Sequence, residues 1–436
     1  MKRPLRFVLV TTFYPPYSFG GDAIHVQALA GALVRAGHRV DVIHSVDAYR
    51  ALHLGEPAGP RPPEVPGLTV HGLSTACGPL SPLLSQQTGR PLLETRRIRE
   101  ILDRTDPDVI HFHNVSLFGP GVLELRGKGG RALKIYTTHE YWLVCPTHVL
   151  WKYNRRVCDS RDCIKCTLLA GRPPQLWRYT HMIERCAAEV DAFLSPSRYA
   201  AAMHERNGFG RAIVHFPLFV ERPAAIDRDL PRPHPRPYFL FVGRLEAVKN
   251  PRSLIEAWHR VPAGDLLVAG TGSQLEALRA LAAGEPRIRF LGHLAQESLD
   301  ALYAHCIACI VPSSMVEIFP LVVLEAFSRK APVVARDLGA LAEMIAESGG
   351  GLLYRTEDEL VAALTRIAHD ATLRSYLGES GHRSVTGRWS ETAYLERYFD
   401  LLSELALRKL GEIPWEEADE GRGGRRATSG PSRLRS

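Results

Sequence analysis

The feature that most constrains this fold is an alternation of apolar, β-rich runs with amphipathic segments. Residues 5–12 are typical of a buried strand, and residues 22–37 place apolar side chains at helical spacing before Gly37. Further strands are predicted at residues 38–45, 108–114, 133–140 and 190–197. This series of βαβ units predicts a parallel sheet covered by helices.

A proline-rich segment interrupts the alternation. Residues 221–238 hold five prolines, which is typical of a linker. The pattern then restarts, with strands predicted at residues 238–244, 266–272, 288–293, 306–313 and 331–337, and a long amphipathic helix at residues 390–409. We therefore predict an α/β fold with two Rossmann-like parallel-sheet domains facing a central cleft, where ligands of such sheets bind.

Length, charge and hydropathy favour a large globular protein without a membrane-spanning helix. The 436 residues carry a net charge of +7 and are 45% hydrophobic, which is enough for large cores. We find no apolar run of about 18 residues, so no membrane-spanning helix is predicted. The first apolar run is too short for a signal peptide. We therefore expect a cytoplasmic protein with reduced thiols.

The C-terminal residues 412–436 divide into two oppositely charged halves. Five acids precede residue 421 and five arginines follow it, so the positive charge belongs to the folded body. This tail lacks the apolar residues that a core needs, and we predict that it is disordered. A contact with anionic lipid at the inner face of the membrane is the second interpretation.

The first candidate functional segment is the loop 242–251, VGRLEAVKNP. Gly243 permits a tight exit from the preceding strand, and Arg244 and Lys249 stand five residues apart before a helix. A guanidinium fork and an ammonium group beside a helix N-terminus suit a diphosphate. Two solvated surface cations are the alternative.

Two glutamates mark a second candidate segment, EIFPLVVLEAF at residues 317–327. Pro320 suits the first turn of a helix, so Glu317 is predicted in the loop before that helix and Glu325 inside it. A carboxylate in an otherwise apolar helix needs a partner, and ribose or sugar hydroxyls are good donors to it. An exposed Glu325 is the alternative.

Glycines follow the first strand of the chain. Gly20 and Gly21 lie between that strand and the first helix, where backbone amides can approach a phosphate closely. Their spacing is not G-x-G-x-x-G, which weakens a dinucleotide interpretation. A plain turn is the alternative.

In this order the motifs resemble those of the retaining family 4 glycosyltransferases, which have the GT-B fold. The resemblance covers about residues 5–410 and rests on the segments described above together with AGTGSQLEALR, IRFLGHL and the closing helix. It implies an acceptor-side domain at residues 1–225 and a donor domain at 226–388. The helix at residues 389–411 is implied to cross back to the first domain.

The resemblance also implies roles for single residues. Arg244 and Lys249 neutralise the donor diphosphate, Glu317 and His139 meet the sugar, and Glu325 binds the ribose. The other donor-binding residues that it implies are Gly20, Gly21, Gly243, Gly292, His293, Leu294, Ile318, Phe319 and Leu321. Catalysis is then electrostatic stabilisation of the leaving nucleoside diphosphate, with no catalytic metal and no assigned protein nucleophile.

Histidines gather at two predicted strand ends. His111 and His113 share one face of the strand 108–114, where each is either a hydrogen-bonded core residue or part of a site. His139 ends the next strand at the edge that faces the cleft. The family places a histidine of this kind against the donor sugar or the acceptor.

Four cysteines fall in the loop 145–166, namely Cys145, Cys158, Cys163 and Cys166. Four thiolates suit a closed, structural zinc site, and nearby lysines and arginines favour the thiolate form. A subgroup of the resembled family carries a similar Cys-rich insertion. Free reduced cysteines, an iron–sulfur cluster and a redox disulfide stay open as alternatives.

These features predict a retaining glycosyltransferase that uses a UDP-, GDP- or ADP-linked sugar. The acceptor is a glycan, a lipid-linked molecule or a small molecule, read by residues 45–95, which have an irregular sequence. A basic body fits peripheral membrane contact. A GT-B-shaped epimerase or phosphorylase is the second hypothesis. A zinc-containing nucleic-acid-binding protein is the third, but it leaves the Arg244–Lys249 loop unexplained, so we expect no nucleic-acid partner.

Overall fold

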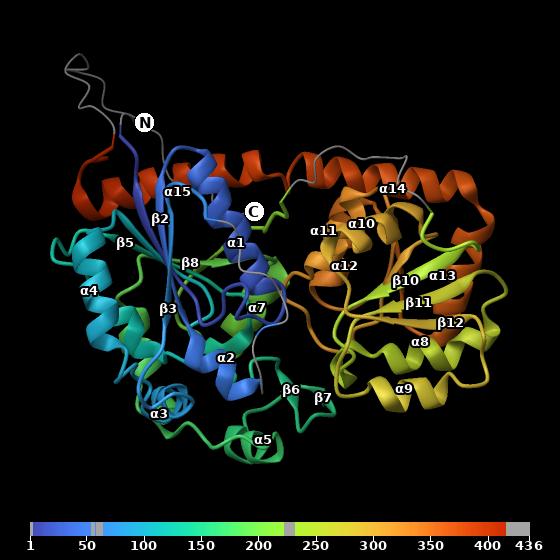
Figure 1. The fold of residues 1–436 in the computed structure, drawn as a ribbon, viewed down its shortest axis with the longest axis horizontal. Coiled ribbons are helices and arrows are strands. Elements are labelled where there is room, and N and C mark those ends of the chain that lie inside the picture. Colours follow the sequence, from blue (N-terminus) through green and yellow to red (C-terminus); the bar gives the residue numbers. More distant parts are fainter. Residues whose placement is uncertain (1–2, 54–56, 58–63, 222–231, 416–436) are drawn as a thin grey trace.

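The computed structural model describes residues 3–53, 57, 64–221 and 232–415, and it holds two α/β domains side by side (Figure 1). The predicted domain boundary near residue 225 and the tail beyond Trp415 lie outside the described residues. Each domain is built on a wholly parallel sheet, so the predicted fold class is confirmed.

The first sheet has seven strands in the order β3-β2-β1-β4-β5-β8-β9. They are β1 (Arg6–Val10), β2 (Arg39–Ser45), β3 (Leu68–Leu73), β4 (Val109–Phe112), β5 (Leu133–Thr137), β8 (Ala192–Ser195) and β9 (Ile213–His215). The direction of strand succession reverses at β1, between β2 and β4. This reversal opens a crevice at the carboxyl ends of the strands.

Helices cover both faces of this sheet. The helices of this domain are α1 (Gly21–Arg35), α2 (Val46–Leu52), α3 (Leu80–Thr88), α4 (Thr95–Thr105), α5 (Cys163–Leu169), α6 (Met182–Ala187) and α7 (Arg198–Arg206), of which α5 lies away from the sheet (Figure 1). Alternate residues of β1 therefore enter two different cores, with Phe7 and Leu9 in one and Val8 and Val10 in the other.

The second sheet has six strands in the order β12-β11-β10-β13-β14-β15. They are β10 (Tyr238–Val242), β11 (Asp265–Ala269), β12 (Ile288–Gly292), β13 (Cys309–Val311), β14 (Val333–Arg336) and β15 (Gly351–Tyr354). Its helices are α8 (Pro251–Ala257), α9 (Leu275–Leu281), α10 (Gln296–His305), α11 (Leu321–Ser328), α12 (Ala340–Ser348), α13 (Glu357–His369) and α14 (Ala371–Thr386). Its strand succession reverses at β10.

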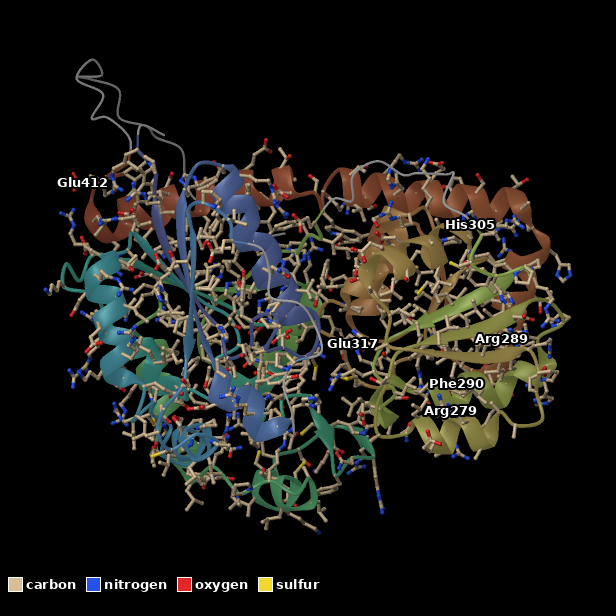
Figure 2. The ribbon with its side chains drawn as sticks, viewed as in Figure 1. Arg279, Arg289, Phe290, His305, Glu317 and Glu412 are labelled. Carbon is tan, nitrogen blue, oxygen red and sulfur yellow. The ribbon has the colours of Figure 1, made fainter. Side chains whose placement is uncertain are left out.

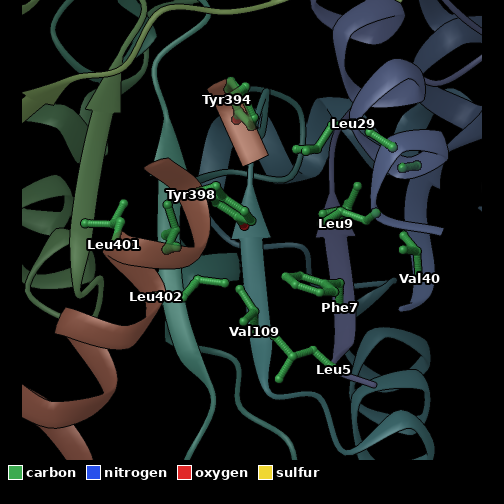
Figure 3. Packing of buried hydrophobic residues seen from close by; sticks show 14 of the residues in the cluster. Leu5, Phe7, Leu9, Leu29, Val40, Val109, Tyr394, Tyr398, Leu401 and Leu402 are labelled. Carbon is green, nitrogen blue, oxygen red and sulfur yellow. The ribbon is translucent and has the colours of Figure 1, made fainter. Parts of the chain in front are cut away.

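The last helix, α15 (Glu391–Leu410), packs on the first domain although it follows the second in the chain (Figure 1). Figure 3 shows Tyr398 and Leu402 of α15 beside Phe7 and Val109 of the first sheet, and these side chains belong to one buried cluster. Burial of this apolar face holds the helix in place.

The two domains also touch directly at α7 and α12. Both carboxylate oxygens of Glu343 on α12 accept backbone N–H groups at the start of α7, from Arg198 and Tyr199, each at 2.9 Å. A carboxylate from one domain thus satisfies free N–H groups at a helix N-terminus of the other.

Several predicted bounds need correction. Residues 45–95 were expected to be irregular, yet they contain α2, β3 and α3. The strands predicted at 133–140 and 306–313 are shorter, so His139 lies past β5 and Cys306 lies at the end of α10. Two short strands, β6 (Trp151–Lys152) and β7 (Arg156–Val157), form a hairpin in the cysteine-rich loop. Within the described residues, no helix has the length and apolarity needed to cross a membrane.

Candidate active site

The Arg244–Lys249 loop leaves β10 at the carboxyl edge of the second sheet, where Gly270 fixes its position. A Cβ atom on Gly270 would lie 1.9 Å from the carbonyl oxygen of Gly243, and one on Gly272 would lie 2.5 Å from that of Leu245. No side chain fits there, so the two glycines after β11 allow the loops to lie in direct contact. The sequence G-x-G at 270–272 therefore has a structural role.

Lys249 and Glu317 form an ion pair between the loops that follow β10 and β13. Lys249 Nζ lies 2.6 Å from Glu317 Oε1, and the hydroxyl of Ser313 donates to the same oxygen at 2.6 Å. Glu317 is buried, and Figure 2 shows it where the two domains meet. The structure thus brings two of the predicted site residues together and adds Ser313, which the sequence did not indicate.

Arg244 stands apart from this pair. Its side chain is exposed, and it has no ion-pair partner within the described part of the chain. Lys249 is thus paired with a buried carboxylate, whereas Arg244 is an exposed cation of the same loop.

Glu325 has a different partner. It lies on α11, and its Oε2 accepts a hydrogen bond from the hydroxyl of Tyr303 on α10 at 2.9 Å. Burial raises the pKa of Glu325 above the ordinary value for a glutamate, and the Tyr303 hydrogen bond opposes that rise. The two glutamates of the 317–327 segment therefore have separate surroundings.

On the opposite side, α1 begins at Gly21, which lies against Leu321 at the start of α11. A Cβ atom on Gly21 would lie 3.2 Å from Leu321 Cδ1, so two predicted residues touch across the domain boundary. Gly20 has φ 104°, which favours glycine. Nearby, the hydroxyl of Ser197 donates to the carbonyl oxygen of Ile318 at 2.7 Å. The 317–321 loop is therefore held by both domains.

Asp22 and Asn114 lie at the same edge of the first sheet and were not predicted. Asn114 Nδ2 donates to Asp22 Oδ2 at 3.0 Å. Burial raises the pKa of Asp22, the Asn114 hydrogen bond lowers it, and the nearby Glu140 raises it further. These two residues are 92 positions apart, so no local sequence signal links them.

The remaining predicted donor residues lie farther along the second domain. Gly292 ends the edge strand β12 and His293 and Leu294 follow it, and the Gly292 carbonyl accepts the Gly270 N–H at 2.7 Å. Phe319 is buried edge-on against Trp389, with ring centroids 5.8 Å apart. In the sheet, β11 and β10 separate β12 from β13, so the 292–294 turn leaves a different part of the sheet edge from the loops that carry Lys249 and Glu317.

His139 lies just past the carboxyl end of β5. Its Nε2 is 2.9 Å from His113 Nδ1, and its ring centroid is 5.5 Å from that of His25 on α1. Burial, followed by the neighbouring imidazoles, lowers the pKa of His113 and His139 well below the ordinary value. Both rings are therefore neutral near pH 7.

The four clustered cysteines line one surface pocket, together with Lys152 and Asp162, and all four thiols are free. Among the described residues, no group of three or more His, Cys, Asp or Glu side chains is arranged to hold a metal ion. Burial first, and then the neighbouring thiols, raise the pKa of Cys158 and Cys163.

Two family models match the chain in succession. Residues 19–222 match the model described as Glycosyltransferase Family 4, and residues 224–384 match the model described as Glycosyl transferases group 1. The two matches meet at the segment that joins the two sheets.

Curated relatives match over most of the chain at low identity. A phosphatidyl-myo-inositol mannosyltransferase of Mycolicibacterium smegmatis is 23% identical over 410 residues, covering 90% of this chain and 94% of the relative. A GDP-mannose-dependent alpha-mannosyltransferase of the same species is 25% identical, covering 88% of this chain and 93% of the relative.

Solved structures share the fold. A sucrose-phosphate synthase from Thermosynechococcus elongatus superposes with a TM-score of 0.71 at 21% identity, covering 93% of this chain and all of that one. The Anabaena protein HepE, solved in complex with UDP and glucose, gives a TM-score of 0.59 at 17% identity, covering 92% of this chain and all of that one.

Proposed function

This chain belongs to the GT-B glycosyltransferases of group 1, and on that premise we propose that it transfers a sugar from a nucleoside-diphosphate sugar with retention of the anomeric configuration. Structural neighbours solved with UDP, UDP-glucose or ADP support a nucleotide-linked donor. The curated relatives named as a phosphatidyl-myo-inositol mannosyltransferase and as a lipopolysaccharide core biosynthesis glycosyltransferase support a glycan or lipid-linked acceptor.

The observation that carries this proposal is the Lys249–Glu317 pair beside the start of α11, at the domain junction. A donor diphosphate at this place meets Arg244 and Lys249 from one loop and the N–H groups of α11 from another. These fixed positive groups stabilise the charge that grows on the leaving diphosphate, so the proposed reaction requires no catalytic metal. Glu325 is then the acceptor for ribose hydroxyls, and His139 meets the sugar from the first domain.

A donor panel tests the function. UDP-, GDP- and ADP-sugars are compared by the thermal shift that each gives, and the donor that stabilises the protein is then incubated with candidate acceptors. The anomeric configuration of the product is read by NMR. We expect the configuration of the donor to be kept, and an inverted product would refute the retaining assignment.

The same reactions distinguish a glycosyltransferase from an epimerase or a phosphorylase, the second hypothesis. An epimerase converts the donor without any acceptor, and a phosphorylase consumes a glycan with inorganic phosphate. Appearance of either product, with no acceptor-dependent transfer, would replace the glycosyltransferase proposal.

We further propose that Cys145, Cys158, Cys163 and Cys166 would hold a structural zinc ion. The four thiols share one pocket, and Arg178 lies close enough to Cys145 and Cys163 for their charges to interact. Its Nη2 atom is buried without a hydrogen-bond partner among the described residues. Four thiolates around Zn²⁺ carry a net negative charge, which this guanidinium would offset.

Metal analysis tests the zinc site. Purified protein is expected to contain one zinc per chain, and Cys163→Ser to lose it together with part of the thermal stability. Cys309→Ser, which changes a buried cysteine of β13, is the control and should keep the metal. If the purified protein lacks stoichiometric zinc, the zinc site is wrong and the four cysteines are ordinary thiols.

Peripheral membrane contact is proposed for one end of the first domain. The indole N–H of Trp177 donates to the Gln86 carbonyl at 2.7 Å, so the turn 176–179 packs on α3. Large exposed apolar side chains gather on α3, α5 and the neighbouring turns: Leu80, Leu83, Leu84, Leu92, Leu93, Ile164, Leu168, Leu169, Leu176 and Tyr179. Exposed Arg161, Lys165 and Arg172 lie among them, and this composition suits an anionic lipid surface.

Vesicle flotation tests this contact. The protein is expected to float with vesicles that contain phosphatidylglycerol and less with pure phosphatidylcholine, and Leu168→Glu with Leu169→Glu should weaken binding. A concentration-dependent dimer that these changes abolish, without vesicle binding, would assign the surface to a second copy of the chain.

A further inference from the structure

Behind His139 lies a row of buried imidazole rings. His111 and His113 come from the end of β4, and their ring centroids are 4.1 Å apart. The rings of His113 and His139 meet through their nitrogens, with centroids 5.2 Å apart and planes 29° apart, and His25 of α1 faces His113 edge-on at 6.4 Å. His111 and His113 are fully buried, whereas His139 is partly exposed.

The innermost ring is held at both of its nitrogens. His111 Nε2 lies 2.8 Å from the hydroxyl oxygen of Thr137, and its Nδ1 lies 2.9 Å from the hydroxyl oxygen of Tyr398 on α15. A ring fixed at two points cannot turn, and the His113 ring packs against it with its plane tilted by 30°. His113 therefore presents a fixed edge to His139.

The direction of the His113–His139 hydrogen bond follows from the other nitrogen of His113. Both rings are neutral, so one Nδ1–Nε2 contact carries a single proton. If His113 accepted at Nδ1, its proton would lie on Nε2, which is buried without a partner among the described residues. A buried N–H without an acceptor is the rarer arrangement in proteins.

His25 shows that this environment accepts an unprotonated Nε2. Its Nδ1 lies 3.4 Å from the carbonyl oxygen of Phe219, which can only accept, so the proton of His25 is on Nδ1. Its Nε2 is then unprotonated, and it too is buried without a partner in the described part of the chain. His113 in the same tautomer donates from Nδ1 to His139 Nε2.

We propose that His113 is a positioning residue that fixes His139 in the Nδ1–H tautomer and leaves that N–H available to a ligand. His139 Nε2 is occupied by His113, so Nδ1 is the ring nitrogen left for a ligand, and the His139 side chain is partly exposed. A neutral N–H donor suits an oxygen of a sugar hydroxyl or of the diphosphate. Its role in turnover rests on the proposed function, whereas the tautomer itself does not.

The tautomer is measured without any substrate. Protein with ¹⁵N-labelled histidine is examined by long-range ¹H–¹⁵N correlation NMR, with His139 assigned by its loss in His139→Asn. We expect a protonated Nδ1 and an unprotonated Nε2 in His139. A protonated Nε2 in the wild-type protein would overturn the proposal, whatever the donor panel shows.

Two substitutions of His113 then test the positioning. In His113→Asn, the side-chain amide nitrogen takes the place of Nδ1 and keeps the donated hydrogen bond. His113→Leu has similar bulk and no donor, so the His139 proton is expected to redistribute between its nitrogens. We expect kcat/KM to fall about tenfold in the leucine variant, the factor of one neutral hydrogen bond, and to recover largely in the asparagine variant.

A buried histidine outside the row controls for general loss of packing. His38 lies at the start of β2, where its Nδ1 accepts the Leu5 N–H at 3.1 Å, and His38→Leu should lower stability without changing kcat/KM. If His113→Leu does not fold, the wild-type and asparagine spectra still decide the tautomer. An unchanged His139 tautomer and unchanged kcat/KM in a folded His113→Leu would also overturn the proposal.

Discussion

Single residues at the domain junction give the most direct test of the donor site. In Lys249→Ala, the diphosphate loses a fixed cation and Glu317 keeps a buried carboxylate without its 2.6 Å partner. We expect kcat/KM for the sugar donor to fall about 100-fold or more, the range seen when one stabilising group is removed from a developing anion.

The control for this variant is Arg279→Ala. Arg279 is an exposed cation on α9 that pairs with Glu276, and Figure 2 shows it away from Glu317. It should keep wild-type kcat/KM. Equal activity in Lys249→Ala and Arg279→Ala would show that the donor diphosphate binds elsewhere.

Glu325 is predicted to act in binding more than in chemistry. Glu325→Gln keeps the shape and can still accept from Tyr303, but it removes the charge that strengthens hydrogen bonds from ribose hydroxyls. We expect the Kd of the nucleoside diphosphate, measured by calorimetry, to rise about tenfold. Tyr303→Phe should raise this Kd less, because the substitution leaves the carboxylate of Glu325 in place. A larger rise in Tyr303→Phe than in Glu325→Gln would assign the nucleotide contact to Tyr303.

The sequence indicated some site residues and missed others for a physical reason. Arg244, Lys249 and the two glutamates stand out because charged groups follow strands or interrupt an apolar helix. Ser313, Tyr303 and the Asp22–Asn114 pair have no such local signal, since each is selected by a partner that only the tertiary fold brings near.

At the scale of an element, the Tyr398–His111 hydrogen bond makes α15 a testable unit. Both groups are buried, so Tyr398→Phe leaves His111 Nδ1 without its partner. We expect this change to lower the free energy of unfolding by about 1–3 kcal/mol, read from urea denaturation. Tyr376→Phe on α14 is the control, because Tyr376 is exposed and should change it little. Equal effects would mean that the hydrogen bond contributes nothing to stability.

The elements also show where sequence patterns lose information. The strands at 5–12 and 238–244 were recognised because both faces are buried and the apolar runs are continuous. β3 was missed because it is an edge strand with half-exposed residues, and α3 because it carries exposed leucines and no charge. Neither pattern has the periodicity of a standard amphipathic element.

At the scale of the whole molecule, buried histidines make stability depend on pH. Burial lowers the pKa of His25, His44 and His204 to about 4 and that of His111 to about 3. Below pH 6.5 the unfolded chain therefore binds more protons than the folded one, so stability falls as the pH falls toward 4. Each such histidine lowers the free energy of unfolding by up to about 2 kcal/mol as the pH falls from 6.5 to 5.

Urea denaturation at pH 7, 6 and 5 checks this dependence. His25→Asn should reduce the slope of the free energy of unfolding against pH by the equivalent of up to one bound proton. His181→Asn should leave this slope unchanged, because His181 is exposed. Glu94 changes the free energy of unfolding with pH in the opposite direction to the histidines. Burial raises its pKa to about 7, so its contribution favours the folded state at low pH and declines between about pH 4.5 and 7. A wild-type curve that is flat from pH 7 to 5 would contradict the prediction.

The return of α15 to the first sheet has a consequence for biosynthesis. A ribosome releases β1 to β9 long before residues 391–410, so the nascent first domain waits with Phe7, Leu9 and Val109 uncovered until translation is nearly complete. Chains interrupted anywhere in the second domain would expose this apolar surface permanently and become targets for chaperones and proteases. The first domain can therefore bury this apolar surface only after the second domain has been synthesised.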